Sequence, residues 1–260
     1  MDQAMRYFYQ LFEQLPRQGP GDAHHTRKAI DSARPHLPSA PTILDIGCGS
    51  GAQTLTVAAT LGGTITALDN HPPFLEQLRQ QARAEQLEAH IFPCLGDLQQ
   101  LPFPPASFDL IWSEGAIYLM GLTAGLRHWG TCLKSNGILV ISDNLWLHRS
   151  PHPEVRAFWQ EESPEMLDLS ATQARIQRLG YTVLDHFTLP IPVWEESYYR
   201  PLEQGIAAMR QQYPASDPIL EQTLATLEQE MRIFRLADGA YSYQYWVLTK
   251  GASGRGAGRW

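Results

Sequence analysis

Leu44-Asp45-Ile46-Gly47-Cys48-Gly49-Ser50-Gly51 places three glycines at alternate positions between a short apolar run and a helix-forming stretch. Glycine is needed where the backbone takes a positive φ or lies flat against a ligand. The N-terminus of the helix behind such a loop offers free N–H groups and a positive dipole end to a negative ligand group. This stretch therefore predicts a strand, a ligand-binding loop and a helix.

Outward from this loop, short apolar runs alternate with helical patterns. The expected strands cover residues 42–46, 64–68, from 90, 108–112, 137–142, 181–184 and 241–249. The expected helices among them cover residues 52–61, 72–87, 122–133 and 171–179. Such alternation predicts an α/β fold with a mainly parallel sheet between two layers of helices. Ligands of such sheets bind outside the carboxyl ends of the strands.

Two segments stand outside this regular pattern. Residues 1–40 are expected to form an N-terminal helical segment, and residues 193–237 a helical insertion before the last strand of a domain spanning 41–250. An apolar stripe with helical spacing supports the insertion. It consists of Leu220, Leu224, Leu227, Met231 and Phe234. Both segments are predicted to form a lid, and residues 251–260 a flexible, Gly-rich tail.

The amino-acid composition excludes several classes of protein. A hydrophobic fraction of 43% in 260 residues is enough for a sizeable core. The net charge of −7 argues against nonspecific binding to nucleic acid. Three widely spaced cysteines indicate neither a disulfide framework nor a zinc site. With no secretory signal or membrane-spanning stretch recognised, we expect a cytoplasmic enzyme, monomeric or homodimeric, that acts on a small molecule.

Two acidic residues distinguish possible ligands of the loop. Asp69 ends the second expected strand, where a carboxylate can accept both hydroxyls of a ribose. Asp45 would repel the pyrophosphate of a dinucleotide but would attract the amino group of S-adenosylmethionine. The third glycine also comes one residue early for the NAD fingerprint. An NAD(P)-dependent oxidoreductase and a non-catalytic module that binds S-adenosylmethionine remain the alternatives.

These motifs resemble those of the class I S-adenosylmethionine-dependent methyltransferases of the bacterial, small-molecule, methyltransferase type 11-like kind. LDIGCGSG (44–51) looks like their first motif, and ALDN (67–70) like their acidic second motif. FDLIWSEGAIY (108–118) is similar to their fourth motif. QGPG (18–21) and W-x-x-x-YY (194–199) resemble further segments of this subgroup. The resemblance implies a Rossmann-like, seven-stranded, three-layer sheet with an antiparallel last strand.

The resemblance also implies a set of cofactor-binding residues. Gly47, Gly49 and Gly51 would hold the methionine end, Asp45 its ammonium, and Asp69 the ribose. Asp97 would accept from the adenine amino group while Leu98 packs on its ring. The full expected set is Asp45, Gly47, Cys48, Gly49, Gly51, Asp69, Asn70, Gly96, Asp97, Leu98 and Ser113. The alternative is that the glycines only make turns and Asp69 only caps a helix.

Catalytic candidates follow from the chemistry of methyl transfer, a displacement that mainly requires alignment of nucleophile, methyl carbon and sulfur. Glu114 is expected as a base or substrate ligand, Tyr118 as part of the methyl channel, and His25 as another possible base. Capping and surface roles are the alternatives for Glu114 and His25. Tyr7, Trp194 and Tyr198, with Glu114 and Tyr118, are expected on the substrate side, although ordinary packing explains most lid aromatics.

A metal site is a weaker possibility. Catechol-type methyltransferases use an Asp-Asn pair after the fifth strand, and Asp143-Asn144 occupies that place here. Together with Glu114, these oxygen ligands would suit Mg²⁺. An Asp-Asn pair more often makes a turn, so we expect no bound metal.

Overall fold

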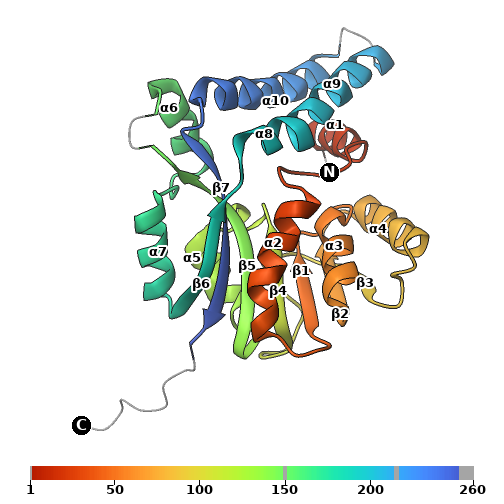
Figure 1. Cartoon of the computed structure of the whole chain (residues 1–260). Helices are drawn as coiled ribbons and strands as arrows, with labels where there is room; N and C mark the ends of the chain where they lie inside the picture. The colour runs from red at the N-terminus through yellow and green to blue at the C-terminus, as the bar shows by residue number, and fades with distance from the viewer. Residues whose placement is uncertain (1, 149–150, 214–216, 252–260) are drawn as a thin grey trace.

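A seven-stranded sheet forms the centre of the computed structural model, which describes residues 2–148, 151–213 and 217–251 (Figure 1). The spatial order of the strands is β3-β2-β1-β4-β5-β7-β6. The strands are β1 (Thr42–Ile46), β2 (Thr64–Asp69), β3 (Ile91–Leu95), β4 (Phe108–Glu114), β5 (Leu133–Trp146), β6 (Tyr181–Thr188) and β7 (Tyr241–Lys250). The first five strands are parallel, and β7 is antiparallel to β5 and β6. The predicted Rossmann-like sheet with an antiparallel last strand is thus confirmed.

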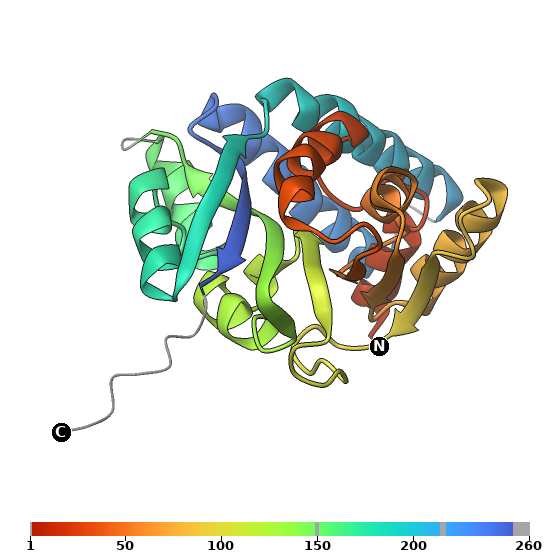
Figure 2. The same cartoon turned by 60° about the horizontal axis from the view of Figure 1, so that its bottom comes forward.

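Helices cover both faces of the sheet, as Figure 2 shows. The α-helices are α1 (Gln3–Phe12), α2 (Ala23–Ala33), α3 (Ala52–Leu61), α4 (Pro72–Ala84), α5 (Leu122–Trp129), α6 (Pro153–Glu162), α7 (Leu169–Arg178), α8 (Ile191–Trp194), α9 (Arg200–Gln212) and α10 (Pro218–Ala237). Successive strand residues point to opposite faces, so Ile43 and Leu44 lie in different core clusters. Ile43 shares its cluster with Ile30 of α2, and Leu44 shares the other with Leu126 of α5.

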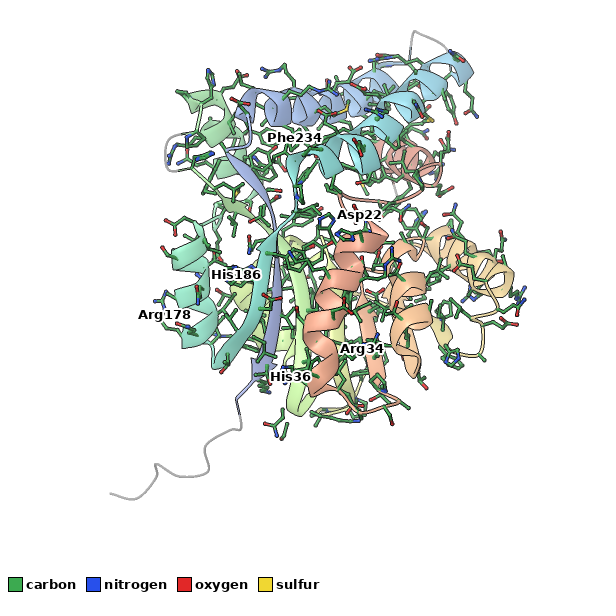
Figure 3. The ribbon with its side chains drawn as sticks, in the orientation of Figure 1. Asp22, Arg34, His36, Arg178, His186 and Phe234 are labelled. Atoms are coloured by element: carbon green, nitrogen blue, oxygen red, sulfur yellow. The ribbon has the colours of Figure 1, made fainter. Side chains whose placement is uncertain are left out.

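Above the carboxyl ends of the parallel strands lies a helical cover made of α1, α6 and α8–α10 (Figure 1). Helix α1 contacts α9 and α10, and α10 contacts α6. The apolar stripe predicted for α10 is buried throughout. Figure 3 shows Phe234 of α10 in this cover and Asp22 at the end of α2 nearest to it, whereas Arg34 and His36 lie at the far end.

The two lid segments differ in how they pack. The insertion predicted at 193–237 forms α8, a π-helical turn (Glu195–Tyr199), α9 and α10. The N-terminal segment is divided: α1 packs on the insertion, while α2 packs on α3 and on the sheet. The domain boundaries themselves stay a prediction. Of the predicted tail 251–260, only Gly251 lies among the described residues.

Several predicted boundaries were wrong, among them the ends of α4 and β6 and those of α5 and β5. The helix expected to reach residue 133 ends at Trp129, because Gly130 closes it and Leu133 already pairs with β4. Strand β5 extends to Trp146 rather than ending at 142, because β7 pairs with it up to Tyr241. No described helix combines the length and apolar character that a membrane span requires.

Candidate active site

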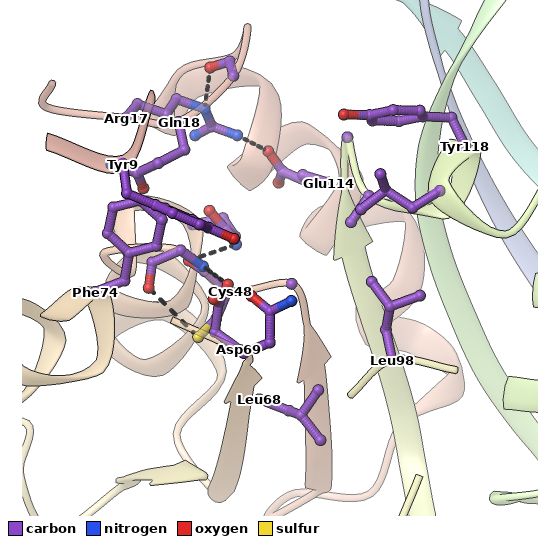
Figure 4. Close-up of a pocket in the computed structure, with 18 of the residues that line it drawn as sticks. Tyr9, Arg17, Gln18, Cys48, Leu68, Asp69, Phe74, Leu98, Glu114 and Tyr118 are labelled. Atoms are coloured by element: carbon purple, nitrogen blue, oxygen red, sulfur yellow. Dashed lines mark hydrogen bonds and ion pairs between the residues drawn. The ribbon is translucent and has the colours of Figure 1, made fainter. Parts of the chain in front are cut away.

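The strand order reverses between β1 and β4, and the glycine loop lies at that point. Ligands of doubly wound sheets bind at such a crevice. Gly47, Cys48 and Gly49 line a cavity of about 370 Å³ there (Figure 4). Gly49 has a φ of +55°, and a Cβ on it would stand 2.4 Å from Oε1 of Gln18. The loop backbone therefore forms part of the cavity wall.

Gly51 has a different role. It caps α3 with a φ of +95°, and a Cβ there would lie 2.2 Å from Cδ1 of Leu78 in α4. Gly51 is not among the residues that line the cavity. The structure thus places this glycine in the packing of α3 against α4, and not at the expected ligand contact.

Asp69 lies at the end of β2 and on the cavity wall. Its Oδ2 accepts from the N–H of Gly49 and its Oδ1 from the N–H of His71, both at 2.9 Å. A carboxylate has about four acceptor positions, so two remain for a ligand. Burial raises the pKa of Asp69. Asn70 beside it is exposed and also lines the cavity.

Asp45 lies behind the loop, with 1% of its surface exposed. It accepts from Oγ1 of Thr54 at 2.6 Å and from Nε2 of Gln53 at 3.4 Å. Its Oδ1 has no hydrogen-bond partner among the described residues. Burial raises its pKa to about 7. Asp45 does not itself line the cavity, but Gln53 does.

The adenine-side candidates are only partly at the cavity. Gly96 and Leu98 line it. Asp97 is exposed and accepts from the N–H of Gln99 at 2.8 Å, outside the lining. Ser113 is fully buried, and its hydroxyl donates to the carbonyl of Ile46 at 2.9 Å. Ser113 therefore ties the end of β4 to β1 rather than reaching the cavity.

Glu114, expected as a base, is surrounded by donors. The guanidinium of Arg17 forms an ion pair with it (Figure 4). Three further donors bind this carboxylate, namely Thr26 at 2.8 Å, Trp112 at 3.0 Å and Tyr245 at 2.8 Å. These four donors take up its acceptor positions. The geometry favours an anchor for the N-terminal segment over a base with a free lone pair.

The QGPG segment reaches the glycine loop through Gln18. Its Oε1 accepts from the N–H and the hydroxyl of Ser50 at 2.8 and 3.0 Å. Its Nε2 donates to the carbonyl of Phe12, at the end of α1. Neither Arg17 nor Gln18 was selected as a site residue from the sequence. The QGPG motif was the available signal for Gln18, whereas nothing local indicated that Arg17 would meet Glu114.

Helix α1 contributes aromatic rings above the cavity. Tyr9 stacks on His71 with ring centroids 3.8 Å apart, and Nε2 of His71 lies 2.7 Å from Oε1 of Glu13. Tyr9 and Phe74 line the cavity and lie on one side of it in Figure 4. The N-terminal helix is thus held over the carboxyl edge of the sheet.

A second cavity of about 260 Å³ adjoins the first, beneath the helical cover. Their shared lining is Phe8, Gln18, Gly19, Pro20, Phe74, Gly115, Tyr118 and Tyr243. The pKa of Tyr118 is raised to about 12 by desolvation of its phenol and by the neighbouring carboxylates. Trp194 and Tyr198 line the second cavity, so the structure brings these two substrate-side candidates together with Tyr118.

The remaining candidates lie elsewhere. The hydroxyl of Tyr7 donates to Asp217 at 2.6 Å, which ties α1 to the start of α10. Nδ1 of His25 lies 2.8 Å from Oδ1 of Asp22, the residue that caps α2. Neither Tyr7 nor His25 lines either cavity.

The residues considered for Mg²⁺ do not form a cluster. Within residues 2–148, 151–213 and 217–251, no group of three or more His, Cys, Asp or Glu side chains could hold a metal ion. Asp143 accepts from the N–H of Asn144 at 2.9 Å, while Glu114 is engaged by its four donors.

A family model described as a methyltransferase domain matches residues 43–137. Methyltransferase GfsG of Streptomyces halstedii is 32% identical over 39% of this chain and 37% of its own length. Malonyl-[acyl-carrier protein] O-methyltransferase of Erwinia pyrifoliae is 34% identical over 52% of this chain and 47% of its own. The chain spans about half or less of the curated relatives it matches.

Solved structures resemble nearly the whole chain. A SAM-dependent methyltransferase from Geobacter sulfurreducens, in complex with S-adenosyl-L-homocysteine, superposes with a TM-score of 0.81 at 19% identity, covering 94% of this chain and 97% of its own. YjhP from E. coli gives a TM-score of 0.80 at 18% identity, with coverages of 94% and 98%. At such identities the likeness shows the fold.

Proposed function

We propose that this chain, which contains a methyltransferase domain of the class I S-adenosylmethionine-dependent family, transfers a methyl group to a small molecule. The observation that carries the proposal is the pair of adjoining cavities at the carboxyl edge of the sheet. The first has the glycine loop and Asp69 in its wall, and the second is largely aromatic. Such an arrangement suits a donor in one cavity and an acceptor in the other.

The first cavity fits S-adenosylmethionine in several respects. Asp69 keeps two acceptor positions for the ribose hydroxyls, with Asn70 beside it. The backbone of Gly47 and Gly49 allows close approach by the methionine end. Asp45 lies behind the loop and does not line the cavity, so its unpartnered oxygen would be compensated by the cofactor's ammonium through water. When bound, this cofactor supplies an electrophilic methyl group.

The adenine contacts rest on fewer observations. Leu98 and Gly96 line the cavity and are proposed to pack against the ring. Asp97 lies between Gly96 and Leu98 but does not line the cavity, so its carboxylate would have to move to accept from the adenine amino group. Asp97 is therefore a proposed contact of the bound state.

Direct displacement requires the acceptor atom, the methyl carbon and the sulfur to lie in line. The shared lining at Gly115, Tyr118 and Tyr243 is the proposed place of transfer. Tyr118 keeps its proton at neutral pH and can donate a hydrogen bond there. The helical cover lies above this passage, and any water it excludes there favours transfer to the bound acceptor over side reactions.

An NAD(P)-dependent oxidoreductase is the second candidate, because the same fold position binds dinucleotides. Asp45 beside the loop disfavours a pyrophosphate, and Gly51 serves helix packing instead. We also propose a cytoplasmic monomer or homodimer without a nucleic-acid or membrane partner. The net charge of −7 and the three free cysteines support this assignment.

The activity is tested by incubating the full chain with S-adenosylmethionine carrying a labelled methyl group and with metabolite extracts. Mass spectrometry then reports any labelled product. We expect labelled product with the wild type and a reduced amount with Asp69→Ala. Cofactor binding without product from any extract would favour a non-catalytic module, and binding of NAD(P) alone would favour the oxidoreductase.

A further inference from the structure

The second cavity contains two carboxylates without a cationic neighbour in its lining. Glu162 of α6 and Glu230 of α10 line it, and no Lys, Arg or His is among its described lining residues. The hydroxyl of Tyr199 donates to Glu230 at 3.0 Å. Glu162 forms no hydrogen bond or ion pair within the described part of the chain. Burial raises the pKa of Glu230 to about 7, so at neutral pH this group is divided between its charged and neutral forms, and a bound cation would favour the charged form.

Five other acidic residues of the same helical cover form ion pairs with arginine. Their ion pairs join Arg210 to Glu221 and Glu228, Arg232 to Glu154, and Arg235 to Glu195 and Glu203. The pairs lie on the exposed side of α6, α9 and α10. Of the two carboxylates that line the cavity, Glu162 is exposed and Glu230 is partly buried, and neither has an ion-pair partner within the described residues. An uncompensated carboxylate in a cavity favours a cationic ligand.

Aromatic rings make up most of the remaining wall. Phe158 and Trp159 come from α6, Trp194 and Tyr198 from the insertion, and Phe8 from α1. The faces of such rings attract organic cations, and the attraction is greatest where the cation is desolvated. Aromatic rings and carboxylates together form the kind of site that recognises an ammonium group with apolar substituents.

The negative charge lies close to the passage between the cavities. Tyr118 lines both, and the carboxylates that act on its phenol are Glu230, Asp143 and Glu162. Asn144, which also lines the second cavity, has an Oδ1 without a partner among the described residues. Nε1 of Trp159, also in the lining, has no acceptor among the described residues, so unpartnered groups of both kinds remain for a ligand.

We propose that the second cavity binds a methyl acceptor that carries an organic ammonium group with apolar substituents, between its aromatic rings and the carboxylates of Glu162 and Glu230. Because an ammonium nitrogen has no lone pair, the methyl group goes to another nucleophilic atom of the same molecule. The identification as acceptor rests on the proposed methyltransferase function. Recognition of the cation rests on the cavity alone and is tested separately.

Isothermal titration of the full chain tests the cation, with and without saturating S-adenosylhomocysteine. The probes are benzyltrimethylammonium and its uncharged carbon isostere neopentylbenzene. We expect the cation to bind about tenfold more tightly or better, the scale of a desolvated cation–π contact with a charged partner. Equal affinities of the two probes would overturn the proposal.

Substitutions of the two carboxylates then test where in the cavity the cation binds. Glu230→Gln and Glu162→Gln should each weaken benzyltrimethylammonium by roughly 3- to 10-fold and leave neopentylbenzene unchanged. Glu161→Gln is the matched control, because Glu161 is exposed like its neighbour Glu162 but does not line the cavity. If the two cavity variants behave like the control, the carboxylates do not recognise the ligand. Circular dichroism identifies any variant that fails to fold.

The two proposals fail in different ways. Tight S-adenosylhomocysteine binding with no preference for the cation would overturn only the acceptor class. A clear cation preference without S-adenosylhomocysteine binding would instead overturn the methyltransferase assignment and leave a cation-binding cavity.

Discussion

Two aspartates beside the glycine loop have contrasting surroundings. Asp69 faces the cavity with two acceptor positions free, whereas Asp45 is sealed behind the loop with one oxygen unpartnered. The sequence places both correctly at strand ends. It could not show that only one of them reaches the cavity, because that depends on how Thr54 and Gln53 of the following helix are turned.

Replacing Asp69 should weaken cofactor binding. We expect Asp69→Ala to cost about 1.5–3 kcal/mol in S-adenosylhomocysteine affinity, or about 10- to 150-fold, because hydrogen bonds to a charged group are lost. Titration calorimetry measures the effect, with Asp31→Ala on the exposed face of α2 as the control. An unchanged affinity would show that the ribose lies elsewhere.

Asp45 should make stability depend on pH. Its folded-state pKa is raised to about 7 by burial, so between about pH 4 and 7 the folded state holds a proton that the unfolded state has lost. Wild-type stability therefore falls as pH rises through this window, and the loss is complete above it. Relative to the wild type, the free energy of unfolding of Asp45→Asn should therefore increase by up to about 1.4 kcal/mol for each pH unit across this window. Urea unfolding at pH 5, 6, 7 and 8 measures the difference; a constant difference would contradict this.

A substitution of Glu114 distinguishes its role as a structural anchor from a role as a catalytic base. If Glu114 is a structural anchor paired with buried Arg17, Glu114→Gln should lower the free energy of unfolding by about 3–5 kcal/mol. Chemical denaturation measures this loss. Full stability with abolished methyl transfer would instead identify Glu114 as the base.

At the scale of elements, local patterns predicted the strand–loop–helix units well. Both β1 and α3 have the predicted bounds, since their apolar residues and flanking glycines are close in sequence. The full length of β5 and the ion pair of Arg17 with Glu114 could not be predicted from local sequence patterns. β5 is lengthened by β7 from the far end of the chain, and Arg17 is 97 positions from Glu114.

Helix α1 depends on one close helix–helix contact. Leu11 is fully buried, and a Cβ on Gly205 of α9 would stand 2.5 Å from its Cδ1. Leu11→Ala should lower stability by about 2–5 kcal/mol through the cavity it leaves. It should also weaken S-adenosylhomocysteine binding, because α1 carries Tyr9 over the site.

Thermal and chemical unfolding measure the first effect, and calorimetry the second. Phe92→Ala is the control, because Phe92 is 51% exposed on β3 and its loss should change stability by no more than about 0.5 kcal/mol. A destabilised Leu11→Ala variant with unchanged affinity would separate α1 from the cofactor site.

At the scale of the whole molecule, the candidate site is assembled from three distant parts of the chain. The sheet edge supplies the glycine loop and Asp69, the N-terminal segment supplies Gln18, and the insertion supplies Trp194 and Tyr198. These parts share one buried cluster, so the helical cover and the sheet are one packing unit. The family motifs identified the first part, whereas the meeting of all three required the structure.

The most direct test is the choice of ligand by the first cavity. Titration calorimetry of the full chain should give micromolar or tighter binding of S-adenosylhomocysteine and no binding of NAD(H). The opposite pattern, with NAD(H) bound and S-adenosylhomocysteine not bound, would contradict the proposed methyltransferase function.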